Sequence, residues 1–201
     1  MNTQTEATAP GGSGFASRLP LVALLLVQIF VGYEWFMSGV TKIYRGGFPS
    51  GLALELTEKS QGAPAWYKSF LDGSIIPNAT AFGYLIEIGE VLIGVALIGA
   101  GLVWLFRWDR LPEGGQIATL LVTALASLGA VVMAVNFHLA NGASHPWLIP
   151  TSGFDEGIDL DSLLPAIQLV FVGASLGFVR SLRHEALRGA AAIGQATSHG
   201  T

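Results

Sequence analysis

The feature that most constrains this chain is an apolar run from Ala79 to Phe106 that contains two carboxylates. A run of this length predicts a transmembrane helix, because about 20 apolar residues cross the hydrocarbon of a bilayer. Residues three and four apart share a helix face. Ionisable groups are costly in hydrocarbon, so we expect both acids to face a bundle interior or a wet cavity. The stripe that holds them consists of Gly83, Glu87, Glu90, Gly94, Leu97 and Gly101.

Composition extends this conclusion to the whole chain of 201 residues, of which 51% are hydrophobic and 12% charged. A soluble domain has about 25% charged residues. The sequence therefore predicts an integral membrane protein with a single domain. It contains no Cys, which excludes disulfides, thiol catalysis and covalent c-type haem attachment. The net charge of −4, without a dense basic patch, argues against nucleic acid as a partner.

Four apolar runs predict an all-α integral membrane four-helix bundle with spans at 19–40, 79–106, 117–140 and 163–182. Residues 1–18 and 183–201 are expected to be tails, the first of them flexible. The long connection between the first two spans is expected to contain short amphipathic helices and to lie as a lid on the outer surface. Its segment PAWYKSFL would supply aromatic side chains at the membrane interface.

Basic residues give the expected orientation, since cytoplasmic loops are enriched in Lys and Arg. One side has six (Arg18, Arg107, Arg110, Arg180, Arg183 and Arg188) and the other has four (Lys42, Arg45, Lys59 and Lys68). We therefore expect both termini in the cytoplasm and the long connection outside.

With this orientation, all four spans place polar groups in the outer half of the bilayer, whereas the inner half has almost none. At 1.5 Å per residue, Glu34 would lie about 9 Å below the outer boundary and Glu87 about 12 Å below it. Glu90 and Glu87 are the candidates for proton transfer. The candidates for substrate binding are Glu34, Lys42, Tyr84, Asn136, His138 and Gln168.

Each candidate also has a structural explanation. Glu34 could pair with Lys42, eight residues further along. Glu87 and Glu90 could be protonated and join helices by hydrogen bonds, since two neighbouring buried carboxyls seldom both ionise. His138 could be an interfacial histidine. Asn136 and Gln168 could be hydrogen-bonding residues between helices. No metal site is expected, and no Walker-type loop, nucleophile elbow or dinucleotide fingerprint is present.

Two segments resemble the signatures of the DoxX-like family, which includes the DoxD-type small subunit of thiosulfate:quinone oxidoreductase. The first is Gly32 to Phe48, GYEWFMSGVTKIYRGGF, and the second is Ile76 to Gly101, IPNATAFGYLIEIGEVLIGVALIGAG. Gly39 and Lys42 match the first signature, and Glu90 with Gly94 matches the second. The resemblance covers about the first half of the chain.

The resemblance implies a four-helix protein of the bacterial inner membrane that accompanies a redox enzyme. We expect at most a subunit of an oxidoreductase, with no covalently bound cofactor, with a quinone as the candidate ligand, and with lipid and other subunits as partners. The alternatives are a purely structural subunit of an energy-transducing complex and a small proton-coupled carrier. Four spans without an inverted repeat make the carrier the weakest of the three.

Overall fold

The computed structural model describes residues 19–142 and 160–198, and this part of the chain is all helical. Its long helices are α1 (Leu19–Arg45), α4 (Ala79–Arg107), α5 (Glu113–Ala140) and α6 (Leu160–Ser198). Each contains a stretch long and apolar enough to cross a membrane, which indicates a multi-pass membrane protein. This confirms the predicted all-α architecture with four candidate spans.

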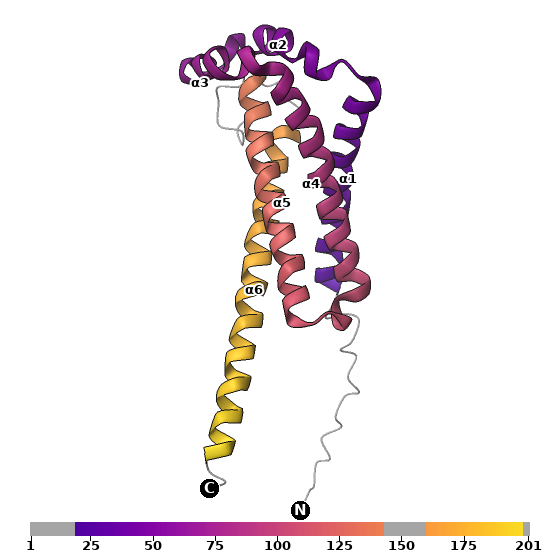
Figure 1. Ribbon diagram of the computed structural model, residues 1–201, viewed down its shortest axis with the longest axis vertical. Coiled ribbons are helices and arrows are strands. Elements are labelled where there is room, and N and C mark those ends of the chain that lie inside the picture. The colour runs from indigo at the N-terminus through magenta and orange to yellow at the C-terminus, as the bar shows by residue number, and fades with distance from the viewer. Residues whose placement is uncertain (1–18, 143–159, 199–201) are drawn as a thin grey trace, which may run out of the picture.

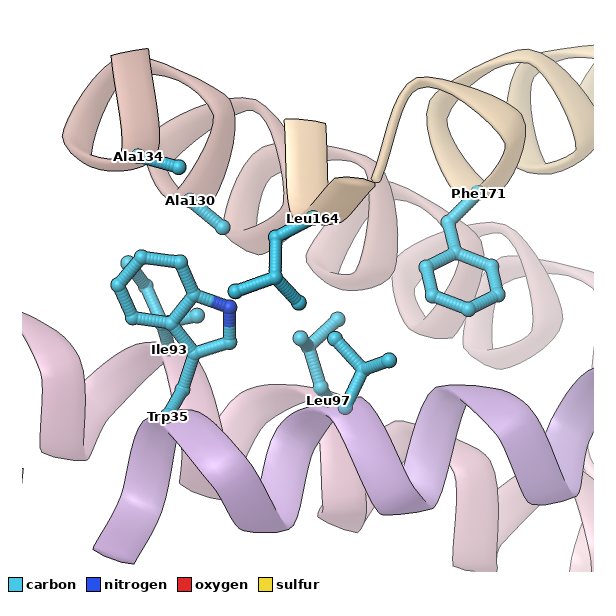
Figure 2. Close-up of a cluster of buried hydrophobic side chains, with 8 residues drawn as sticks. Trp35, Ile93, Leu97, Ala130, Ala134, Leu164 and Phe171 are labelled. Atoms are coloured by element: carbon cyan, nitrogen blue, oxygen red, sulfur yellow. The ribbon is translucent and has the colours of Figure 1, made fainter. Parts of the chain in front are cut away.

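The four long helices form an elongated bundle in which α1 packs on α4, α5 packs on α6, and α4 also contacts α5 (Figure 1). The centre of the bundle is filled by side chains from all four helices. Figure 2 shows Trp35 of α1 and Leu97 of α4 facing Leu164 and Phe171 of α6. Leu97 and Phe171 are at most 2% exposed, so this layer excludes solvent from the middle of the bundle.

Helices α1 and α4 approach each other closely because glycines lie between them. A Cβ at Gly39 would lie 2.7 Å from the backbone oxygen of Glu87, and a Cβ at Gly94 would lie 2.5 Å from the nitrogen of Phe36. Both distances are shorter than real Cβ contacts. Small residues allow such backbone approach in membrane bundles. The acid-bearing stripe of α4 is buried against this contact, as expected from its sequence.

One end of the bundle is covered by the chain between α1 and α4, which we call the cap (residues 48–78). It comprises α2 (Phe48–Lys59), η1 (Ser60–Gly62), α3 (Ala65–Phe70), η2 (Leu71–Ile75) and η3 (Ile76–Asn78). The sharp turn from α1 into α2 uses Gly46 and Gly47, both with positive φ, a conformation that glycine adopts without a steric penalty. An apolar cluster packs the cap onto the bundle, and its buried members include Leu52, Leu71 and Ala79.

The helices are longer than the predicted spans at several ends. Helix α1 continues to Arg45, and α5 begins at Glu113 rather than at residue 117. Helix α6 continues through Ser198, although a tail was expected from residue 183. Its end projects beyond the bundle (Figure 1). The start of α1, the α4–α5 turn and the end of α6 all lie at the end opposite the cap.

Candidate functional site

A cavity of about 520 Å³ lies between the cap and the ends of α1, α4 and α5. Its walls are mainly aliphatic and aromatic, and polar groups enter it from several elements. The polar lining consists of Ser38, Lys42, Glu55, Lys59, Tyr67, Glu90, Asn136 and Asn141. A largely apolar pocket with a few polar groups is typical of a small-molecule site.

The most buried charged group of the cavity lining, Glu90 of α4, forms an ion pair with Lys42 of α1. The Lys42 ammonium donates to Glu90 Oε1 at 2.7 Å and Oε2 at 2.6 Å, and to the Ser38 hydroxyl at 2.7 Å. The Glu90 side chain is 1% exposed and that of Lys42 is 24% exposed. A lysine ammonium has three N–H groups, so the chain itself supplies an acceptor for each one.

Aromatic rings surround this pair. The Lys42 nitrogen lies 5.3 Å from the ring centroid of Phe48 and 5.9 Å from that of Phe137, distances at which a cation is attracted to an aromatic face. Tyr67, Phe70 and Phe82 add three more rings to the walls. The cavity therefore presents an electrically neutral ion pair inside an aromatic enclosure.

The cap is fastened to the bundle beside the cavity by Tyr67. This side chain is 4% exposed, and its hydroxyl lies 3.0 Å from Asn136 Oδ1 and 3.1 Å from the Asn136 backbone oxygen. The Asn136 amide in turn donates to the oxygen of Val132. Tyr67 was expected in an interfacial aromatic belt. Trp66 and Phe70 are indeed exposed, whereas Tyr67 points inward and bonds to α5.

The expected pair between Glu34 and Lys42 is wrong, because Lys42 pairs with Glu90. Eight residues on a helix correspond to about 12 Å along its axis, beyond the reach of one lysine side chain. The antiparallel contact of α1 with α4 instead brings Glu90 beside Lys42. Glu34 lies on an exposed face of α1 and is not part of the cavity lining.

Of the eight candidate residues, three line the cavity: Lys42, Glu90 and Asn136. Glu87 is buried too, but it is not part of the cavity lining. Tyr84 is 54% exposed on α4. His138 is buried on α5 and Gln168 on α6, both outside the lining.

Buried polar groups also lie deeper than the predicted outer layer. Gln28 of α1 is 3% exposed and donates to the Leu97 oxygen at 2.9 Å and to Thr123 Oγ1 at 3.4 Å. Ser127 and Ser175 are buried as well. The expectation of an apolar inner half is therefore wrong. Short polar side chains on membrane helices are easily overlooked because they bond to the backbone of neighbouring turns and helices.

Sequence reasoning missed Ser38, Phe48, Tyr67 and Phe137 as lining residues. Ser38 could have been found, since it precedes Lys42 by one helical turn and shares its face. The aromatic residues had no such signal, because their places depend on how the cap folds over α5.

Comparison with protein-family models, with curated proteins and with solved structures finds no match for this chain.

Proposed function

We propose that this chain is a DoxX-like membrane subunit of a redox complex, and that its cavity takes up a quinone beside Lys42 and Glu90. The observation behind the proposal is the ion pair of buried Glu90 with Lys42 in the lining of a cavity rich in aromatic side chains. Both residues of this pair are among those that match the two DoxX-like signatures, together with Gly39 and Gly94. The chain would be a multi-pass protein of the bacterial inner membrane with both termini in the cytoplasm.

The chemistry of the cavity favours an uncharged, ring-shaped ligand. Lys42 and Glu90 neutralise each other, so a charged ligand would enter an apolar site without a counter-ion, at a large desolvation cost. A quinone carbonyl is a neutral acceptor that could replace the Ser38 hydroxyl at the Lys42 ammonium. Half-exposed Phe70 and exposed Leu85 line the cavity and would let an apolar tail extend towards lipid.

Glu90 is the candidate for proton exchange with the bound quinone. Reduction of a quinone to a quinol takes two electrons and two protons, and the electrons would come from the redox partner. Glu90, ionised in its pair with Lys42, would accept one proton when a quinol is oxidised, and the second proton would pass to water; reduction of a quinone would run both proton transfers in reverse. Glu87 lies outside the cavity lining, so its effect would be weaker.

The test is quinone-linked turnover of the purified complex, measured beside a thermal stability scan of the same sample. We expect Glu90→Gln to reduce turnover by about 10²-fold, the lower range for loss of a general acid or base, while assembly is preserved. Glu87→Gln should reduce it less. Glu58→Gln, at an exposed position of α2 outside the cavity lining, is the matched control and should keep full turnover.

The second candidate is a purely structural accessory subunit. It is favoured by the completeness of the Lys42 contacts, since three acceptors of the chain already satisfy the ammonium. Full turnover in both Glu90→Gln and Glu87→Gln, with normal assembly, would support this function over the quinone site.

A further inference from the structure

Glu34 is an ionisable residue on the outside of a predicted membrane span. It lies on α1, eight residues and about 12 Å before Lys42, and its side chain is exposed. Charged groups within membrane spans almost always face the bundle interior and pair with another group. Glu87 and Glu90 follow this rule, as both are buried. Glu34 does not.

The described part of the chain provides no partner for Glu34. The lysines of the described chain pair with other acids: Lys42 with Glu90, Lys59 with Glu55 and Lys68 with Asp72. Lys42, the basic residue nearest to Glu34 along the sequence, therefore already pairs with Glu90. Predicted span 19–40 itself contains no Lys, Arg or His.

The surroundings of Glu34 resemble a protein interface. Phe30 and Met37 lie about one turn before and after it, and Tyr33 directly precedes it on the same stripe, with exposed fractions of 70% for Phe30, 54% for Tyr33 and 37% for Met37. Aromatic residues and Met are enriched where proteins bind each other. In the described part of the chain α1 packs chiefly on α4, and these three side chains stay exposed. We call this stripe the outward face of α1 (Phe30, Tyr33, Glu34 and Met37).

We infer that the outward face of α1 binds a transmembrane helix of another subunit, and that this helix presents a basic side chain to Glu34. A second copy of the chain in a symmetric contact would place Glu34 against a face without a cation, and hydrocarbon offers no hydrogen-bond donor. A basic residue in a partner helix satisfies the carboxylate at this depth. The inference rests on the proposal that the chain is a subunit of a larger complex, and not on the ligand of the cavity.

Photocrosslinking from single cysteines tests this inference, and the cysteine-free sequence makes the labelling specific. A benzophenone maleimide on Met37→Cys should crosslink, in native membranes, to one transmembrane peptide that contains Lys, Arg or His. The same probe on Leu125→Cys, a 73% exposed position of α5, should give only lipid adducts. Adding Glu34→Gln to Met37→Cys should reduce the protein crosslink at least about tenfold, as expected when one member of a buried charge pair is removed.

Charge exchange then identifies the contact itself. Glu34→Lys should abolish the crosslink, and replacing the basic residue of the captured peptide by Glu should restore it. Glu58→Gln, which removes an exposed carboxylate from α2, should leave it unchanged. Crosslinks only to lipid, only to a second copy of this chain, or to a peptide without a basic residue would each overturn the inference. Quinone binding by the Glu34→Gln protein, measured in parallel, separates this result from the fate of the cavity proposal.

Discussion

Lys42 has a carboxylate on its own helix and another on the neighbouring helix, and it pairs with the second. This pairing affects stability, because Glu90 is 1% exposed and Lys42 balances its charge. Removing one member of a buried pair leaves an uncompensated charge, which costs more than the intact pair contributes. Single and double substitutions should therefore differ strongly.

Lys42→Met is expected to lower the free energy of unfolding by about 3–5 kcal/mol, since it leaves Glu90 buried without a counter-ion. The double variant Lys42→Met with Glu90→Leu should recover most of this loss. Denaturation in mild detergent measures both. Lys59→Met breaks a pair whose side chains are about half exposed, and should cost less than about 1 kcal/mol. Additive losses for Lys42 and Glu90 would contradict a direct pair.

At the level of helices, the contact between α1 and α4 determines where the ion pair can form. The two helices approach each other at glycines. A Cβ added at Gly39 or Gly94 would meet backbone atoms of the other helix, not only the flexible end of a side chain. A backbone atom cannot move aside alone, so an added methyl group must separate the helices. This separation would also move Glu90 away from Lys42.

Gly94→Ala should therefore destabilise the protein by about 1–3 kcal/mol, the usual cost of overpacking. Gly99→Ala on the same helix is the matched control, because nothing lies within 4 Å of its Cβ. It should be neutral or stabilising by up to about 1 kcal/mol through helix propensity. Thermal unfolding of the two variants side by side measures the difference. Equal stabilities would show that the helices tolerate a wider spacing.

At the level of the whole molecule, the bundle has a capped end and an opposite end, where α1 begins and α6 finishes (Figure 1). The cavity lies at the capped end, so the side of the membrane that the cap faces decides on which side the site is placed. The six-to-four distribution of Arg and Lys predicts that the cap faces outward.

Cysteines at Gly51 and Gly114 test this orientation, since both positions are exposed and lie at opposite ends of the bundle. A membrane-impermeant maleimide should label Gly51→Cys in intact cells, and should label Gly114→Cys only after the membrane is opened. The native sequence, which has no Cys, provides the unlabelled background. Labelling of Gly114→Cys from outside would place the cavity on the cytoplasmic side.

Most of the fold could be predicted from the sequence, because helix formation in a membrane depends on local quantities. A span needs only enough consecutive apolar residues, and the faces of a helix follow from its period. Both rules held for the four long helices and for the buried stripe of α4 with Glu87 and Glu90. The same rules found Glu90 and Asn136, since a polar group in a span is conspicuous, whereas Lys42 lies just past predicted span 19–40 and was singled out as a possible partner of Glu34.

The assembly of the site was decided only by tertiary structure. The spacing within α1 puts Glu34 about 12 Å from Lys42 along the helix axis and so disfavours that pair. It cannot identify Glu90 as the partner, because that depends on how far α1 slides along α4. That register is fixed by glycine contacts between helices, which sequence spacing within one helix cannot specify. In the same way, Tyr67 becomes a cavity residue only because the cap folds back onto Asn136, 69 residues away in the chain.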